Sequence, residues 1–597
     1  MRLHRMYVEG FKRINKAEVI FGEATFLIGA NNAGKSSALR AIEWLLSDKK
    51  QLDQEFYCAE IDPETGEQNT VCNTVILEAE FRDVPADAVG WRAFKGRVFD
   101  YDPGSSGETG KRIFYRKTYK LGDNVTIELK SLVRTLKPAY AKAAKADDLI
   151  SSGANEAGVL EIFPDRDKKF GATEKSKLEL IDEIWDISEE EVWDKNPGGI
   201  AGVVLSRLPT YLLVPAEYSA NEIDSKSGVL QKTLNELFKD VRANSKHYQV
   251  AQSSLNELAR ELDPSDGGSE FGKMMAELNG VLSGVFPESK ILASADLSNP
   301  DSALVPSFEI QMASNIRSSV AHQGTGMERA AVFGLLRFRQ QWIKQRAKDD
   351  RSLIIGFEEP EIYLHPSAAN QMRDIIYELS GKSSQIVATT HSPYLIDLAR
   401  KPRQVLNRFY YDSGHTTIHP FSVSDEFSKL QSSDKDQVKM LLRLDDHASR
   451  IFFTRKVIVV EGDTEELVLK EAIRRMDAAK RAAIQSKTEI LKARGKASII
   501  GLVKYLSALG VSFFVIHDRD QGTPGAEVFN EPIGLAAGSP NKVAMIQECI
   551  EDLLGYAPPS SEKPYKAYQQ TLKWGDDWDG VPTALKELMA RAYEPYI

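Results

Sequence analysis

A glycine-rich segment near the start of the chain constrains the fold more than any other feature. Residues 29–36 read Gly-Ala-Asn-Asn-Ala-Gly-Lys-Ser, which satisfies the phosphate-loop pattern Gly-x-x-x-x-Gly-Lys-Ser. An apolar stretch at 25–28 precedes the segment, and residues 37–46 have helical periodicity. Because strand, glycine turn and helix are the context in which such a loop wraps phosphates, we expect an α/β fold that binds ATP.

Each residue type in this loop has a use in holding a nucleotide. The two glycines let backbone N–H groups turn toward phosphate oxygens, and Lys35 can reach the β- and γ-phosphates. The Ser36 hydroxyl can bind the Mg²⁺ that accompanies ATP. The predicted nucleotide-binding residues of the loop are Gly29, Asn31, Asn32, Gly34, Lys35, Ser36 and Ser37.

Two further segments follow predicted strands downstream. The apolar run 353–357 ends in Glu358 and Glu359, and a second run at 385–389 leads to His391. The carboxyl edge of a parallel sheet is where such folds bind ligands. Glu358 would support Mg²⁺, Glu359 would polarise the attacking water, and His391 would sense the γ-phosphate. Glu358 stands where Asp is commoner, which is a modest departure from the usual pattern.

Between the phosphate loop and the paired acids lies a candidate signature motif. Residues 323–329 read Gln-Gly-Thr-Gly-Met-Glu-Arg and open a predicted helix. Gly324 and Gly326 would let the helix N-terminus approach a γ-phosphate across a dimer interface. In this order, the motifs resemble the SMC/RecF-like branch of ABC ATPases, in which two heads sandwich two ATP molecules. The resemblance implies a homodimer or a higher homo-oligomer.

A second group of acids lies far along the chain. Apolar runs at 457–460 and 512–516 are followed by four predicted metal ligands: Glu461, Glu465, Asp518 and Asp520. The four-residue spacing of the two glutamates would aim both at one point from the start of a helix. Oxygen ligands of this kind suit Mg²⁺ or Mn²⁺. Two such ions, roughly 4 Å apart, can activate water and stabilise the leaving oxygen of a phosphodiester.

A further acid and a lysine would complete such a site. Glu551 is the predicted additional ligand, with Asp552 and Glu548 as alternatives. Lys563 is the predicted catalytic lysine that stabilises the transition-state phosphate, with Lys566 as its alternative. Acids after strands can instead be solvated caps, but two clusters of them favour a metal site. The combination resembles the Toprim fold of topoisomerases, primases and some nucleases.

The order of these segments predicts a domain plan. We expect an ABC-type ATPase in two parts, at 1–215 and 291–430, interrupted by a helical insertion at 216–290. Heptad-like apolar spacing in the insertion indicates either a solvated helical hairpin or a dimerisation element. A Toprim nuclease domain is expected at 445–597. The charged stretch 141–200 is expected to be irregular.

Composition bounds the class of protein. The net charge of −10 does not advertise a DNA partner, so basic patches or metal ions would have to carry DNA binding. Lys and Arg residues between 470 and 504 form either a solvated helix face or such a patch. We find no run of about 18 apolar residues, no secretory signal and only three scattered cysteines. A cytoplasmic protein without membrane contact is therefore expected.

An ABC-type ATPase followed by a Toprim unit is the arrangement of the OLD (overcoming lysogenisation defect) nucleases, and the resemblance spans nearly the whole chain. It implies a dimeric, metal-dependent DNA endonuclease under ATP control. It also implies a place in antiviral defence, alone or with a helicase or retron component. Two alternatives stay open: a non-cleaving DNA-repair or tethering ATPase with a regulatory Toprim domain, and a topoisomerase with a nucleophilic tyrosine. A nuclease assay and a search for a covalent DNA adduct would separate them.

Overall fold

The chain divides into two compact units in the computed structural model, Met1–Ala216 with Asp349–Ile597 and, separately, Glu217–Lys348. The structure describes residues 1–61, 68–70, 72–91, 93–101, 109–197, 201–216, 234, 238, 245–261, 269, 272–277, 311–313, 317–319, 331–332, 334–336, 338, 352–362, 364, 366–381, 384–397, 403–412, 415–422, 434, 438, 440, 448–522 and 524–597. The domain limits expected from the sequence stay predictions.

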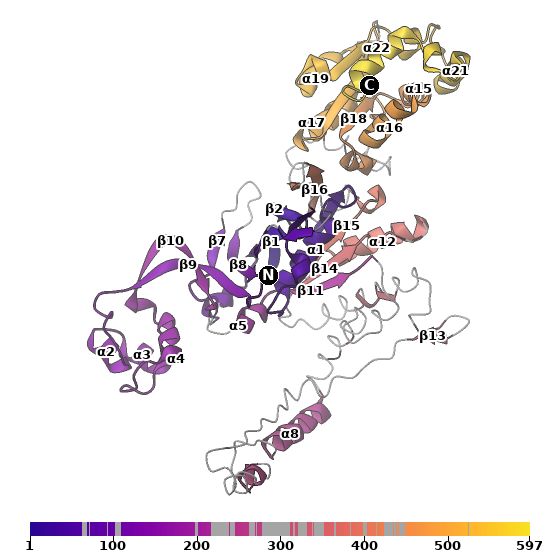
Figure 1. Cartoon of the computed structure of the whole chain (residues 1–597). Helices are drawn as coiled ribbons and strands as arrows, with labels where there is room; N and C mark the ends of the chain where they lie inside the picture. The colour runs from indigo at the N-terminus through magenta and orange to yellow at the C-terminus, as the bar shows by residue number, and fades with distance from the viewer. Residues whose placement is uncertain are drawn as a thin grey trace. The chain divides into compact units, whose positions relative to one another are not determined.

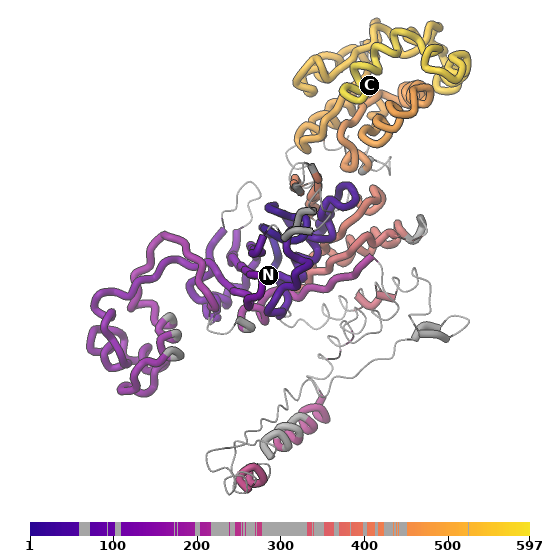
Figure 2. Tube along the Cα trace, in the orientation of Figure 1, coloured from indigo at the N-terminus to yellow at the C-terminus, as the bar shows by residue number. Residues whose placement is uncertain are grey.

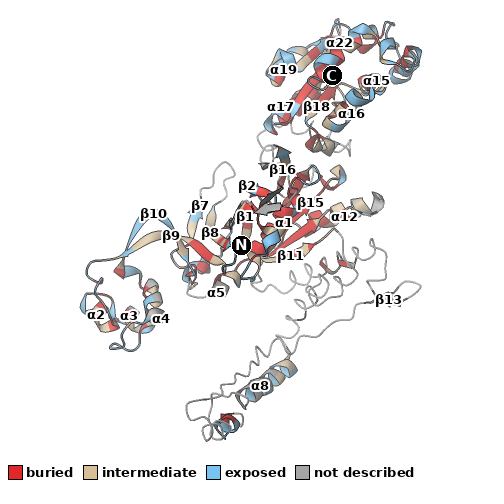
Figure 3. Cartoon of the chain, in the orientation of Figure 1, coloured by how far each residue is buried: buried red, intermediate tan, exposed pale blue. Residues whose placement is uncertain are grey.

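A six-stranded sheet lies at the centre of the nucleotide-binding part. Its order is β11-β14-β15-β3-β16-β17, with every neighbouring pair parallel except the last. The strands are β3 (Ala24–Gly29), β11 (Thr210–Val214), β14 (Leu353–Glu358), β15 (Ser384–Thr389), β16 (Gln404–Asp412) and β17 (His415–Ser422). The middle strands are buried nearly throughout (Figure 3), as parallel strands covered on both faces must be. The three strands that the sequence predicted therefore lie side by side.

One helix covers each face of this sheet. Helix α1 (Lys35–Leu46) follows β3 directly, and its buried side chains share a core with Leu27. On the opposite face, the ring of Phe26 lies 6.0 Å from that of Tyr377 on α12 (Pro366–Leu379). Since adjacent residues of a strand point to opposite faces, this alternation fixes which helix lies on which side.

An antiparallel sheet packs on the other side of α1. Its main path is β10-β9-β8-β6-β1-β2, with β7 (Phe99–Tyr101) paired to β8. The strands are β1 (Arg2–Phe11), β2 (Ile14–Ile20), β6 (Thr74–Arg82), β8 (Gly110–Lys120), β9 (Thr126–Leu136) and β10 (Trp185–Lys195). Apolar residues from both sheets and from α1 form one continuous core. The phosphate loop is therefore held between two sheets.

Residues 141–197 contain regular helices and a strand, so the expectation of an irregular stretch is wrong for this described part of 141–200. Strands β9 and β10 extend as a ribbon that carries α2 (Ala146–Ser151), α3 (Glu156–Ile162) and α4 (Ala172–Lys177) at its tip (Figures 1 and 2). These helices have a small core of their own, which includes Leu149, Val159 and Ile184. The charged residues that made the sequence look irregular lie on the exposed surface around it.

The C-terminal part contains a separate parallel sheet in the order β19-β18-β20-β21. Its strands are β18 (Lys456–Val460), β19 (Thr488–Lys492), β20 (Ser512–Asp518) and β21 (Val543–Ile546). Its larger helices are α15 (Asp463–Arg474), α16 (Ala478–Lys487), α17 (Lys496–Ala508), α19 (Asn530–Ala537), α21 (Lys563–Thr571) and α22 (Thr583–Ala592). Side chains of α15, α21 and α22 share a core with one face of β18 and β20.

The remaining described elements are few. In the unit Glu217–Lys348, helix α8 (Lys246–Glu261) falls within the predicted helical insertion, and β12 (Gln311–Ala313) pairs with β13 (Arg317–Ser319). The three cysteines are free thiols. Over the described part of the chain, the structure contains no helix with the length and apolar character that a membrane crossing requires.

Candidate functional site

The phosphate loop joins β3 to α1 and depends on glycine at both ends. Gly29 has φ +144°, and a Cβ there would lie 2.3 Å from the carbonyl oxygen of Phe409. Gly34 caps α1 with φ +103°, a conformation that side chains with a Cβ rarely adopt. Asn32 also has positive φ, at 64°. The predicted loop residues Asn31, Asn32 and Ser36 are exposed, whereas Ser37 is buried.

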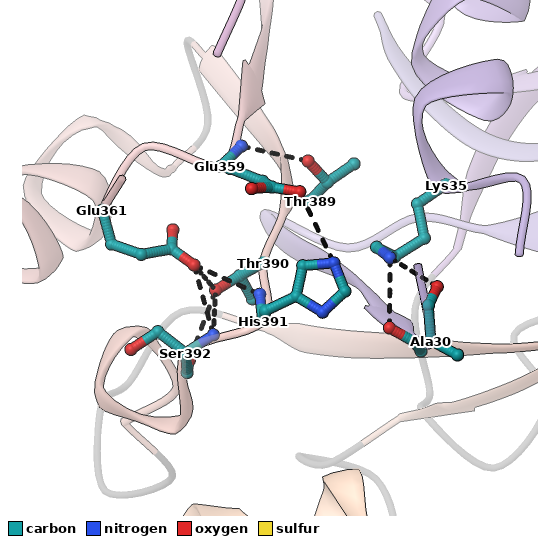
Figure 4. A network of polar contacts seen from close by, with 9 residues as sticks. Ala30, Lys35, Glu359, Glu361, Thr389, Thr390, His391 and Ser392 are labelled. Atoms are coloured by element: carbon teal, nitrogen blue, oxygen red, sulfur yellow. Dashed lines mark hydrogen bonds and ion pairs between the residues drawn. The ribbon is translucent and has the colours of Figure 1, made fainter. Parts of the chain in front are cut away.

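Lys35 points back across this loop. Its Nζ donates to the carbonyl oxygens of Gly29 at 3.1 Å and Ala30 at 2.8 Å (Figure 4). Burial lowers the pKa of Lys35 to about 8, and the charges of Glu359 and Glu361 act in the opposite direction. The lysine predicted to reach the phosphates therefore lies within electrostatic range of the acids that follow β14.

The paired acids end β14 and face the end of β15. We call residues 358–361 the paired-acid turn and residues 389–392 the histidine loop. The backbone N–H of Glu359 donates to Thr389, to its carbonyl oxygen and its hydroxyl, both at 3.1 Å. Glu359 has φ +42°, an uncommon conformation for a residue with a Cβ that often marks functional positions. Its Oε1 lies 3.4 Å from Nε2 of His391.

The surroundings of His391 favour the neutral, unprotonated form of its imidazole. Burial lowers its pKa, and the positive charge of Lys35 lowers it further, while Glu359 acts in the other direction. A neutral imidazole can donate from one nitrogen and accept at the other. Lys35, Glu359 and His391, which the sequence assigned to different motifs, thus form one polar corner. Glu358 lies beside it, at the end of β14. Gly324 and Gly326 of the predicted signature motif lie outside the described residues.

Glu361 is a residue of this corner that motif spacing did not single out. Its Oε1 accepts hydrogen bonds from the Thr390 hydroxyl at 2.6 Å and from the backbone N–H groups of His391 at 3.1 Å and Ser392 at 3.2 Å (Figure 4). Burial raises the pKa of Glu361. Its position after the paired acids is visible in the sequence, but its partners come from another strand and are visible only in the fold.

The second group of acids also gathers at the carboxyl ends of parallel strands. Glu461 directly follows β18, Glu465 lies in the first turn of α15, and Asp518 ends β20. Asp520 follows with φ +54°, in the left-handed region that Asp adopts more readily than Glu does. Glu551, on the short helix α20 (Ile550–Leu553), is buried.

These carboxylates repel one another. Burial, together with the charges of Glu465, Glu461, Asp520 and Glu551, raises the pKa of Asp518 to about 8. The pKa values of Glu461 and Glu465 are also raised, first by burial. Like charges that are held together in a partly buried site favour protonation or a bound cation. The acids are therefore close enough to interact strongly.

Several of their oxygens have no hydrogen-bond donor. Glu461 Oε2, Asp518 Oδ1 and Glu551 Oε1 are buried and unpartnered. In contrast, Oε2 of Glu465 accepts the backbone N–H of Gly462 at 2.9 Å, so this acid also caps α15. Among the described residues, no group of three or more Asp, Glu, His or Cys side chains lies in an arrangement that could hold a metal ion. The donors nevertheless fit a hard divalent cation, which prefers carboxylate oxygens.

Lys496 belongs to this site, although the sequence gave no sign that it would lie near the acids. It was grouped with the basic residues of 470–504, yet it is 4% exposed and its Nζ lies 2.6 Å from Oδ2 of Asp520. It also donates to Asn530 at 3.1 Å. The motif gave no signal for this contact, because Lys496 begins α17 while Asp520 follows β20. Lys496 thus supplies a buried positive charge inside the acidic cluster.

The alternatives for the additional acid and the lysine differ in their surroundings. Glu551 is buried and raises the pKa of Asp518, whereas Asp552 is exposed and accepts the backbone N–H of Cys549. The pKa of Glu465 is raised overall, and the positive charge of Lys563 acts against this rise. This exposed lysine therefore lies within electrostatic range of the cluster. The surroundings favour Glu551 over Asp552.

The basic residues between 470 and 504 do not form an open patch. Seven of them pair with acids of the chain: Lys470, Arg474, Arg475, Lys480, Lys492, Lys496 and Lys504. Because these pairs neutralise the charge locally, the interpretation as a solvated, ion-paired surface fits better than a basic patch that tracks phosphates.

Comparison with known proteins identifies both parts. A family model described as AAA ATPase domain matches residues 1–396. The chain belongs to the AAA ATPase domain family. A second model, described as the TOPRIM domain of overcoming lysogenization defect protein-like proteins, matches residues 452–520 of this AAA ATPase family member. The predicted α/β fold, with an ATPase followed by an OLD-like Toprim domain, is confirmed.

Two curated relatives cover different shares of the chain. The Old nuclease of Escherichia phage P2 is 22% identical over 530 residues, which are 87% of this chain and 77% of that protein. The OLD nuclease of Thermus scotoductus is 25% identical over 261 residues, 41% of this chain and 47% of that protein. The resemblance to the OLD family that the motifs predicted is thereby confirmed.

Solved structures of SMC heads overlap the chain loosely. The SMC head bound to the C-winged helix domain of ScpA has a TM-score of 0.35 and 13% identity, and covers 72% of this chain and 100% of that chain. The SMC head domain from Thermotoga maritima has a TM-score of 0.27 and 13% identity, and covers 70% of this chain and 99% of that chain.

Proposed function

We propose that this AAA ATPase family member is a divalent-metal-dependent DNA endonuclease whose cleavage is controlled by ATP. The observation that carries the proposal is the cluster at the carboxyl edge of the C-terminal sheet. Three buried carboxylate oxygens there lack donors, and the pKa of Asp518 is raised to about 8. Burying unpaired carboxylates is costly, so a site built this way fits a cation better than a structural role. Both curated relatives are named nucleases.

Some residues of this cluster would bind the metal ions, and others would orient a ligand or contact the DNA phosphate. Glu461, Asp518 and Glu551 would hold Mg²⁺ or Mn²⁺ through their unpartnered oxygens, with Glu465 and Asp520 completing a two-ion set. When bound, such ions activate water and stabilise the leaving oxygen of a phosphodiester. Asp520 would be aimed by Lys496, which lies 2.6 Å away. Lys563 would place a positive charge where negative charge develops on the DNA phosphate.

The ATPase site would act as the control. Gly29, Gly34 and Lys35 would hold the phosphates of ATP, and Ser36 and Glu358 its Mg²⁺. Glu359 would polarise the attacking water, and His391, 3.4 Å from it, would contact the γ-phosphate. Gly324 and Gly326 would complete the site from a second copy, so a homodimer or higher oligomer is proposed, with helix α8 within the helical insertion expected to dimerise.

A place in antiviral defence, alone or with a helicase or retron component, is the biological setting we propose. This setting is proposed from the relatives and not from the structure. One of those relatives is a phage protein. DNA is the proposed substrate. Because the basic residues of 470–504 are paired with acids of the chain, we expect bound metal ions to make the main contact with the DNA phosphates.

Plasmid nicking tests the proposal. Purified protein is incubated with supercoiled plasmid and Mg²⁺ or Mn²⁺, with and without ATP, and open-circle and linear products are measured over time. Wild-type protein should nick, E461A should not, and EDTA should stop the reaction. E587Q, a change of an exposed glutamate on α22, is the matched control and should nick as the wild type does. Nicking by E461A at the wild-type rate would remove the site assignment, and no nicking by any protein would favour a non-cleaving ATPase.

A further inference from the structure

The histidine loop is held by one carboxylate that no motif assigns. Glu361 sits at the end of the paired-acid turn, and its Oε1 accepts all three donors that the histidine loop offers it: the Thr390 hydroxyl and the N–H groups of His391 and Ser392. The Thr390 hydroxyl also accepts the N–H of Ser392 at 2.9 Å (Figure 4). A single oxygen thus fixes three consecutive residues.

The same two segments are joined a second time, through the backbone N–H of Glu359. Glu359 donates its backbone N–H to Thr389, and the N–H of Ile362 bonds back to the Glu359 carbonyl oxygen at 3.0 Å. The paired-acid turn and the histidine loop are therefore one hydrogen-bonded block. Within the block, the Glu359 carboxylate and the His391 imidazole meet at 3.4 Å.

We propose that Glu361 is a positioning residue that fixes His391 relative to Glu359 during ATP hydrolysis. Backbone N–H groups locked by a carboxylate leave the imidazole few orientations, and reacting groups lose rate steeply when they are misplaced. This inference rests on the role proposed for His391 at the γ-phosphate. Glu361 bonds to the Thr390 hydroxyl and to the loop backbone, so it acts through the loop that it binds.

Hydrogen-bond acceptance, and not charge, is the property that this position needs. Oε2 of Glu361 is buried without a donor, and burial raises the pKa of the side chain. A glutamine at the position keeps an acceptor oxygen for the three donors, whereas an alanine removes it. E361Q should therefore retain most of what E361A loses.

Steady-state ATP hydrolysis by the full chain tests the proposal, with fluorescent-nucleotide binding and thermal melting measured alongside. We expect E361A to lower kcat by roughly 10- to 100-fold, with KM, nucleotide affinity and melting temperature little changed. We expect E361Q to lose less than about threefold, and E378A, a change of an exposed glutamate on α12, to behave as wild type. The double variant E361A/H391A should be no slower than H391A alone, because both changes disable the same imidazole.

Each other outcome has a definite meaning. Wild-type kcat in E361A, with a slow H391A, overturns the positioning role and leaves the role of His391 intact. Wild-type kcat in H391A overturns the role proposed for the histidine itself. E361Q as slow as E361A overturns the claim that acceptance matters. An additive loss in the double variant, or loss of nucleotide binding and melting temperature in E361A, shows that Glu361 does not act through His391.

Discussion

The two sites of this molecule use the same architecture for opposite charges. In both, apolar parallel strands deliver acids at their carboxyl ends, and in both an acid just beyond a strand has positive φ: Glu359 at 42° and Asp520 at 54°. They differ in partners. In the ATPase corner, a lysine, an imidazole and backbone N–H groups lie near the acids, and among the described residues Glu361 has a buried oxygen without a donor. In the C-terminal cluster, three carboxylate oxygens lack donors.

This difference indicates what each site can take. A site in which a lysine crosses a glycine loop and an imidazole lies beside the acids suits a polyanion such as ATP. A site whose acids raise one another's pKa is organised for a cation. The comparison also gives a general caution. Acids after strands look alike in a sequence, and only their partners separate a phosphate-binding corner from a metal-binding one.

The largest expected effect comes from neutralising the cluster. D518N should reduce plasmid cleavage by about a thousandfold, since the metal chemistry it supports contributes several kcal/mol. The same variant should hydrolyse ATP within about twofold of the wild type. Both rates are measured on one preparation. ATP hydrolysis lost together with cleavage would mean that the two sites are not chemically independent.

The reciprocal change should affect the other site. E359Q removes the group that polarises water while keeping its size, so ATP turnover should fall about 100-fold. Nucleotide binding should persist, and Mg²⁺ should shift the melting temperature as it does in wild type. Phosphate release and a thermal melt with Mg²⁺ measure these. Unchanged turnover would move the catalytic role from Glu359 to Glu358.

The parts predicted from the sequence are those that depend on neighbours in the chain. The phosphate loop followed from its glycines and the apolar strand before it, and the acids followed from the strands that they end. Lys496 could not be assigned, because its contact with Asp520 joins α17 to the end of β20. Glu361 was in view, but its partners arrive from β15.

The ordered region around 141–200 was missed for a related reason. Its core residues, such as Leu149 and Ile184, are widely spaced in the chain and separated by charged residues. Periodicity over a short window detects a core that one element contributes by itself. It cannot detect a small core assembled from short helical segments and the tip of a ribbon, because that depends on contacts between distant residues.

A smaller effect should separate the buried lysine of the cluster from the surface ones. K496M removes the counter-charge of Asp520, so the metal-free protein should lose about 2 kcal/mol of unfolding free energy. Mg²⁺ should then raise the melting temperature more than in wild type, because the ion replaces the missing positive charge. K492M is the matched control, since Lys492 pairs with Asp463 and Glu466 at 2.8 Å each, neither of them in the predicted metal set. Equal behaviour of the two variants would place Lys496 outside the functional cluster.

The last prediction concerns the pH dependence of the free energy of unfolding, and it tests the repulsion among the carboxylates of the cluster. The pKa of Asp518 is raised from 3.8 to about 8, so between these values the folded protein holds a proton that the unfolded chain has released. The stabilising contribution is therefore complete below about pH 4 and is lost as the pH rises through about 8. Metal-free wild-type protein should unfold more easily at pH 8.5 than at pH 5.5, by about 3 kcal/mol.

Two variants show whether this slope comes from the cluster. D518N should flatten it, because an amide cannot titrate. D463N should not, since Asp463 is exposed and paired with Lys492, and its pKa is lowered by that lysine. Mg²⁺ should stabilise the wild type more at pH 8.5 than at pH 5.5, because at the lower pH protons compete for the same oxygens. Denaturant titrations at both pH values, with EDTA or Mg²⁺, give all of these free energies. A steep slope that survives in D518N would assign the repulsion to Glu461 and Glu465, whose pKa values are also raised by burial, and not to Asp518.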